Sequence, residues 1–144
     1  MAVTLDGVLL SGTPVMNHPL VLPMAAHAAM TAFLYVLLTL ARAPKVWGAK
    51  FGADVEDLLT VLEPRLSANL SNQFEWPVLF YVACLLLVQT GGESLLACLL
   101  AWGFVLGRVV HSFVQITTSN VRWRGIVFSI NFLAVLGLWV LLAA

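Results

Sequence analysis

The chain has 144 residues, of which 61% are hydrophobic and 10% are charged, and its seven basic and seven acidic side chains cancel. Soluble domains are about 45–50% apolar and about 25% charged, so this composition excludes an ordinary soluble domain and predicts an integral membrane protein. Zero net charge gives no reason to expect a nucleic-acid partner, and without a CxxC motif or a His/Cys cluster the sequence predicts no metal site.

Four apolar segments predict four membrane spans. A transmembrane helix needs roughly 20 predominantly apolar residues. We expect such helices over about residues 20–41, 67–90, 94–116 and 123–143. The predicted fold class is therefore all-α, a single integral-membrane four-helix bundle that takes up residues 1–144.

The second span is unusual because its uncharged part, residues 76–90, is too short to cross a bilayer alone. Its helix is expected to begin near Ser67 and so to include the polar sequence SANLSNQFE. Pro77 lies inside this helix and should free the backbone carbonyl four residues earlier, that of Gln73. The segment ADVEDLLTVLEPRL, which precedes the span, predicts a short amphipathic surface helix in a solvated loop, interrupted by Pro64.

The basic residues predict the orientation. The connection between the first two spans and the connection between the last two both carry basic side chains, whereas the other connection and the two ends carry none. With four spans, these two connections lie on the same side, which the positive-inside rule makes cytoplasmic. Both termini are then non-cytoplasmic. A bacterial inner membrane and an internal eukaryotic membrane both fit, and we expect the former. The basic residues concerned are Arg42, Lys45, Lys50, Arg65, Arg122 and Arg124.

Polar side chains at the start of the second span allow two interpretations. Asn72 and Glu75 are three residues apart and share a helix face with Asn69. The first interpretation is an ordinary helix start, with Asn69 or Ser71 as the N-cap and Glu75 in the first turn. The second is a polar site at the edge of the membrane. These residues alone favour neither.

A second polar group lies on the third span, where Arg108, His111 and Gln115 follow one helix face. Arg108 is about eight residues from the predicted end of the span, roughly 12 Å at 1.5 Å per residue. A charge at that depth usually faces a partner or a cavity. Glu75 is the expected partner, either in a pair that only fixes packing or as part of a ligand site.

The fourth span begins with a further polar group. Arg122 and Arg124 serve as topology markers, Asn131 can hydrogen bond between helices, and His27 on the first span is expected to be a packed, satisfied residue. All three groups fall in one half of the membrane and combine a carboxylate with arginines, a histidine and amides. That combination suits a small, polar anionic molecule held beside lipid.

The motifs NQFEWP in the second span and GRVVHSFVQ in the third, with an arginine opening the fourth, resemble the MAPEG family, the membrane-associated proteins in eicosanoid and glutathione metabolism. The similarity runs from about Met24 to the C-terminus. It implies a homotrimer of four-helix protomers. Active members bind glutathione between adjacent subunits near the cytoplasmic face and activate its thiol for attack on lipophilic electrophiles or hydroperoxides.

Carried over to this sequence, the resemblance implies contacts between glutathione and Asn72, Glu75, Arg108 and His111. It assigns catalysis to Arg124, which would stabilise the thiolate. A thiol of pKa about 8.5–9 is a poor nucleophile at neutral pH until a cation lowers that pKa, and a guanidinium stays charged in a low-dielectric site. The implied partners are membrane lipid, a lipophilic small molecule and two further copies of the chain.

The sequence also departs from the family pattern. Ser71 and Ala68 stand where glutathione-binding members usually carry arginines, Gln115 where many carry a tyrosine, and Gly125 where some carry a hydroxyl residue. Two functions therefore stay open, a glutathione-dependent transferase or peroxidase and a non-catalytic membrane protein of the same fold that binds a lipid or protein partner. A transporter is disfavoured because the spans carry few charges and no paired broken helices.

Overall fold

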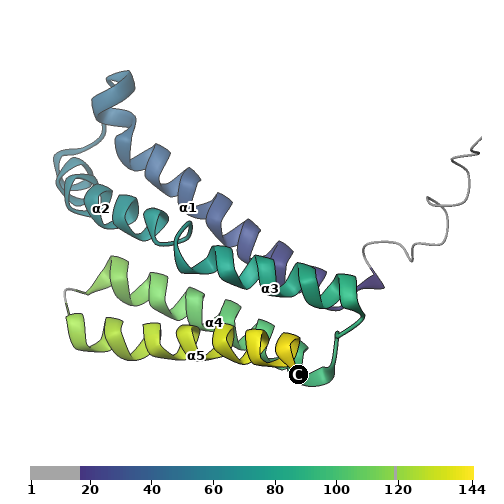
Figure 1. The fold of residues 1–144 in the computed structure, drawn as a ribbon. Helices are drawn as coiled ribbons and strands as arrows, with labels where there is room; N and C mark the ends of the chain where they lie inside the picture. Colours follow the sequence, from purple (N-terminus) through teal and green to yellow (C-terminus); the bar gives the residue numbers. More distant parts are fainter. Residues whose placement is uncertain (1–16, 119) are drawn as a thin grey trace, which may run out of the picture.

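The computed structural model describes residues 17–118 and 120–144, and five α-helices make up its framework (Figure 1). Helix α4 lies beside α5, and α1 runs along α2 and α3. The helices are α1 (Val21–Trp47), α2 (Ala53–Ser71), α3 (Trp76–Thr90), α4 (Leu95–Thr117) and α5 (Val121–Ala143).

Four segments are long and apolar enough to cross a membrane: α1, α4, α5, and α2 with α3 taken together as one interrupted segment. The all-α fold class with four membrane spans is thereby confirmed. Lipid offers no hydrogen bonds to backbone groups, so long apolar runs adopt helices, which satisfy those groups within the segment.

Helix α1 continues past residue 41 and includes Pro44 near its end. It stops at Gly48, whose φ of 64° places it in the left-handed region, and the Gly48 N–H donates to the carbonyl of Ala43. Glycine adopts this conformation without the steric penalty that a Cβ would bring.

The predicted interruption at Pro64 is wrong. Helix α2 runs through Pro64 to Ser71, because its apolar face packs on α1 in a cluster with Leu66 and Leu70 buried, and that packing outweighs the lost backbone hydrogen bond. The chain breaks later, at residues 72–75, so the helix expected over 67–90 is two helices.

The apolar core has two parts. The larger part joins the first turn of α1 to α3, α4 and α5, where Phe80 and Phe104 stack with ring centroids 4.2 Å apart. The smaller part joins α1 to α2, with Ile116 of α4 packed against it. The break between α2 and α3 lies between the two parts, and polar side chains gather there.

Candidate functional site at the break in the second span

Arg108 is the centre of the candidate site. Its side chain, on α4, is 1% exposed, and it donates from Nε to Gln73 Oε1 at 3.1 Å and from Nη2 to the backbone carbonyl of Asn72 at 3.0 Å. The break between α2 and α3 exposes that carbonyl, since no helical N–H reaches it. One freed backbone carbonyl and one side-chain amide oxygen therefore hold the buried cation in place.

The geometry corrects two expectations. Glu75, the expected partner of Arg108, is exposed and forms no ion pair with it among the described residues, although its charge still acts on Arg108 electrostatically. The backbone carbonyl that accepts from Arg108 is that of Asn72, whereas Pro77 was expected to free that of Gln73. Both differences have one cause: the helix ends at Ser71, so Glu75 does not continue along the face that carries Asn72.

The predicted N-caps are also wrong. Asn69 and Ser71 lie inside α2 rather than at a helix start. Helix α3 begins after Glu75, whose side chain makes no capping hydrogen bond. Pro77 stands in the first turn, where a backbone N–H would have no partner within the helix, so the missing N–H costs no hydrogen bond. The polar stretch is thus the end of one helix and a turn, not the capped start of another.

Gln73 connects the break to two other helices. Its Oε1 accepts from Arg108 and from His27 Nε2 at 3.1 Å, and its Nε2 lies 3.2 Å from Asn69 Oδ1 and 3.3 Å from Ser112 Oγ. A single amide therefore ties α1, α2 and α4 together. Each of its polar atoms has a protein partner, which is what burial in an apolar setting requires.

His27 has both ring nitrogens occupied. Its Nε2 faces an amide oxygen that can only accept, so Nε2 carries the proton, and Nδ1 then accepts from the hydroxyl of Tyr81 at 2.8 Å. The ring also lies 5.5 Å from that of Phe104. His27 is thus a packed, hydrogen-bonded residue, as predicted.

Gln115, on α4, accepts hydrogen bonds from two asparagine side chains at the end of α2. Asn69 Nδ2 donates to Gln115 Oε1 at 2.9 Å and Asn72 Nδ2 donates to the same oxygen at 3.0 Å. The Asn72 side chain is thus committed to α4 within a single chain. We call the paired side chains of this cluster the paired network; its members are His27, Asn69, Asn72, Gln73, Tyr81, Arg108, Ser112 and Gln115.

A second set of polar groups, between α4 and α5, lacks partners within the described chain. His111 Nδ1, Arg124 Nε and both amide atoms of Asn131 are buried without a hydrogen bond. His111 lies close enough to Arg124 to interact with it electrostatically, and its ring is 6.4 Å from that of Phe128. Arg124, Phe128 and Asn131 follow one face of α5. We call His111, Arg124 and Asn131 the unpaired set.

The structure therefore divides the predicted site residues. Asn72 and Arg108 meet through a hydrogen bond, and His111 follows Arg108 by one helical turn and approaches Arg124. Glu75 lies at the surface of the single chain. Its carboxylate is therefore reached from outside the chain, unlike the buried side chains of Arg108 and His111.

Sequence reasoning missed the part that Gln73 plays. We considered this residue only for its backbone carbonyl, although it follows Asn69 by four residues and so shares its helix face. Two amides at that spacing, at membrane depth, are a signal for interhelical hydrogen bonding. Ser112 carried no such signal, because a serine in a membrane helix commonly bonds its own backbone.

The charge balance of the site favours an anion. Arg108 has no acidic partner within ion-pair distance among the described residues, and Arg124 adds a second guanidinium near His111. Carbonyl and amide oxygens hold Arg108 without cancelling its charge, and Glu75, which acts on Arg108 electrostatically, offsets only one of the two guanidinium charges. In the described part of the chain, no three His, Cys, Asp or Glu side chains are grouped so as to hold a metal ion.

Comparison with known proteins gives one match. A model of the MAPEG family matches residues 20–144. No curated protein and no solved structure matches the chain.

Proposed function

The chain belongs to the MAPEG family, and from that premise we propose that it is a glutathione-dependent transferase or peroxidase acting on lipophilic electrophiles. Its site lies where the break in the second span meets α4 and the start of α5. The thiol of glutathione, a tripeptide, is the nucleophile, and the lipophilic substrate reaches this thiol from the bilayer.

The observation that carries this proposal is the unpaired set. A buried guanidinium nitrogen and a buried imidazole nitrogen without partners are costly, and such groups are retained where a ligand supplies the missing bonds. Arg124 and His111 are neighbours, so one anionic group of a ligand can reach both. A thiolate fits, since it is small, anionic and tolerant of an apolar surrounding.

The chemistry requires the thiol to lose its proton before it reacts. The Arg124 guanidinium stabilises the thiolate, and each unit by which the thiol pKa falls corresponds to about 1.4 kcal/mol. The thiolate sulfur then forms a bond to the electrophilic carbon, and the electron pair of the broken bond departs with the leaving group. With a hydroperoxide, the thiolate sulfur attacks the terminal oxygen and the O–O bond breaks, so that the alcohol leaves and a sulfenic acid remains on the sulfur. The thiol of a second glutathione then attacks this sulfur, which gives the disulfide and releases water.

Other residues hold the remainder of the tripeptide. Glu75 is exposed, and its carboxylate can accept a hydrogen bond from the amino group of glutathione. His111 can contribute a hydrogen bond through Nδ1. Arg108 and Asn72 each use part of their donors inside the chain, so Arg108 contributes mainly its positive charge, and each has fewer donors left for the ligand. Ser71 and Ala68 supply no charge for the carboxylates, which predicts weaker binding than a site with bidentate arginines.

We further propose that three copies assemble in a bacterial inner membrane with both termini non-cytoplasmic. The site supports assembly because it is open at Glu75, so a neighbouring chain is needed to enclose the tripeptide. The orientation rests on the basic residues in the α1–α2 and α4–α5 connections. Mass measurement of the detergent complex tests the trimer, and protease access in sealed vesicles tests the orientation.

The decisive experiment compares Arg124→Ala with Arg122→Ala. Both arginines lie in the first turn of α5, but only Arg124 has a buried, unpartnered nitrogen. We expect Arg124→Ala to abolish glutathione turnover with the oligomer intact, and Arg122→Ala to keep it. Turnover that survives in Arg124→Ala contradicts the catalytic assignment.

A second candidate is a non-catalytic membrane protein of the same fold that binds a lipid or protein partner. The observation that favours it is the internal pairing of Arg108 and Asn72, which leaves fewer groups for a tripeptide. Calorimetry on the purified protein separates the two candidates. Saturable glutathione binding supports the enzyme, and no binding up to millimolar glutathione supports the second candidate.

A further inference from the structure

Arg108 has one guanidinium nitrogen that the described part of the chain leaves unused. Its Nε donates to Gln73 Oε1, and its Nη2 donates to the backbone carbonyl of Asn72. The third nitrogen, Nη1, forms no hydrogen bond among the described residues, and unlike Arg124 Nε it is not one of their fully buried atoms without a partner. A guanidinium is planar and rigid, so two anchored nitrogens determine where the third one points. Nη1 is therefore a donor of fixed orientation that another molecule can use.

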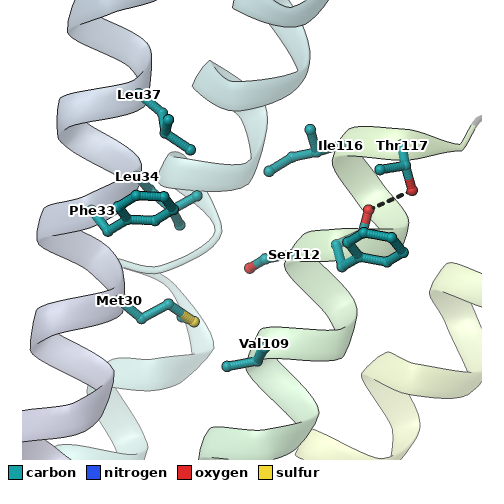
Figure 2. Close-up of a pocket in the computed structure, with 9 residues that line it drawn as sticks. Met30, Phe33, Leu34, Leu37, Val109, Ser112, Ile116 and Thr117 are labelled. Atoms are coloured by element: carbon teal, nitrogen blue, oxygen red, sulfur yellow. Dashed lines mark hydrogen bonds between the residues drawn. The ribbon is translucent and has the colours of Figure 1, made fainter.

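Gln73, which provides one of the two anchors, is itself held at both ends of its amide. Its Oε1 also accepts from His27 Nε2 at 3.1 Å. Its Nε2 donates to the backbone carbonyl of Asn69 at 3.3 Å and to the hydroxyl of Ser112 at 3.3 Å, and Figure 2 shows that the Ser112 side chain projects from α4 toward the side of α1. Turning the amide over would place donors against donors and acceptors against acceptors. The oxygen of Gln73 therefore stays toward Arg108.

The anchor of Arg108 is neutral, which distinguishes it from an ordinary buried ion pair. Charged side chains are rarely buried unless an opposite charge is in contact with them. Arg108 is 1% exposed, yet an amide oxygen and a backbone carbonyl hold it, and Glu75 acts on it only at longer range from an exposed position. A carboxylate in place of the amide would neutralise the guanidinium and repel an approaching anion. The amide of Gln73 does neither.

We propose that Gln73 is a positioning residue of the glutathione site, which fixes Arg108 without neutralising it, so that Arg108 Nη1 donates to a carboxylate of glutathione. The inference rests on the proposed function, because glutathione supplies the anionic group. Glutathione has two carboxylates, and Ser71 and Ala68 offer them no cation. Arg108 is then the cation available to one of them. Gln73 does not touch the ligand and acts on it only through Arg108.

The test compares two ligands by calorimetry on the purified full-length protein, glutathione and its diethyl ester, in which both carboxylates are blocked. Gln73→Glu keeps the shape of the side chain but places a carboxylate against Arg108. We expect the unaltered protein to bind glutathione about tenfold more tightly than the diester, a factor that corresponds to about 1.4 kcal/mol. In Gln73→Glu this ratio should fall to about one, because glutathione binds more weakly while the diester binds as before.

Two further variants separate positioning from stability. Gln73→Leu removes the anchor without adding a charge, so it should also lower the ratio, and it tests the role of Gln73 if melting curves show that Gln73→Glu is unfolded. Leu138→Ala is the control for a loss of stability, because Leu138 is fully buried in the larger part of the core and lies outside the paired network. We expect Leu138→Ala to melt earlier but to keep the tenfold ratio.

The outcomes distinguish this inference from the proposed function. Glutathione binding by the unaltered protein with the same ratio in folded Gln73→Glu would overturn the positioning role and leave the function intact. A ratio lowered equally in Leu138→Ala would show that Gln73 acts only through the stability of the fold. Failure of the unaltered protein to bind either ligand would overturn the proposed function, and the inference with it.

Discussion

The paired network and the unpaired set lie in the same half of the bundle and use similar residue types, yet their hydrogen bonding differs completely. In the network, Gln73 satisfies Arg108 and His27 at once. In the unpaired set, Asn131 is fully buried and neither of its amide atoms has a partner in the described chain. Burial and polarity alone therefore do not distinguish the two groups, whereas their hydrogen-bond partners do.

The difference has a local cause. The paired network forms where α2 and α3 separate, because the break turns side-chain and backbone acceptors of residues 72 and 73 toward α4. Helix α5 has no such break, so the carbonyls in its interior are used within the helix, although the backbone of Arg124 near its start still interacts with His111. Polar side chains between α4 and α5 must find partners elsewhere.

The largest effect is expected from Gln73→Leu. This change keeps the side-chain size but removes the acceptor of Arg108 Nε and His27 Nε2; the bond to the charged arginine contributes about 1.5–3 kcal/mol and the bond to the neutral histidine about 0.5–1.5 kcal/mol. We expect the free energy of unfolding to fall by about 3 kcal/mol, measured by thermal melting in detergent. Gln89→Leu, at an exposed position of α3, is the control and should change little. Equal melting of the two variants would show that the network does not stabilise the fold.

Gly107→Ala should have the next largest effect. A Cβ at Gly107 would collide with Asn131 Oδ1, whereas a Cβ at Gly103, one turn earlier on α4, meets open space. Overpacking of this kind costs about 1–3 kcal/mol, while Gly103→Ala should be neutral or slightly stabilising. Melting curves of both variants are compared with those of the double variant Gly107→Ala/Asn131→Ala. The comparison measures the energetic coupling between positions 107 and 131. Failure of the second substitution to relieve the first would contradict the close contact.

Asn131→Leu sharpens the comparison because it is expected to stabilise the fold, whereas Gln73→Leu is expected to destabilise it. The leucine has nearly the same shape and removes two buried atoms that lack partners, so we expect the free energy of unfolding to rise by about 1 kcal/mol. Unfolding of the ligand-free protein in denaturant measures it. A loss of stability would mean that Asn131 is bonded to a group outside the described chain, such as water or a second copy.

Glu75→Gln should have the smallest effect. Glu75 is exposed and forms no ion pair with Arg108 among the described residues, so its attraction for Arg108 acts at longer range and supports the fold only weakly. Surface changes of this kind stay within about 0.5 kcal/mol. We therefore expect unchanged melting but weaker glutathione binding by calorimetry. A clear drop in melting temperature would restore the direct pair that the sequence suggested.

Part of the candidate site could be predicted from the sequence. The spacing of Arg108, His111 and Gln115 placed them on one helix face, and the structure buries all three. The partner of Arg108 could not be predicted, since Glu75 and Gln73 are equally plausible until the end of α2 is known. Local patterns gave Pro64 as the breaker, but contacts of α2 with α1 keep the helix intact there.

The sequence by itself determined the membrane location, the all-helical class, the four spans and the MAPEG family, since backbone groups in lipid must bond within a helix and long apolar runs permit little else. Only the tertiary structure decided where the second span breaks and which polar groups meet. Those outcomes depend on which faces of α1 and α4 are turned toward the break. The periodicity of a local sequence segment carries no information on a contact between residues as far apart as His27 and Gln73.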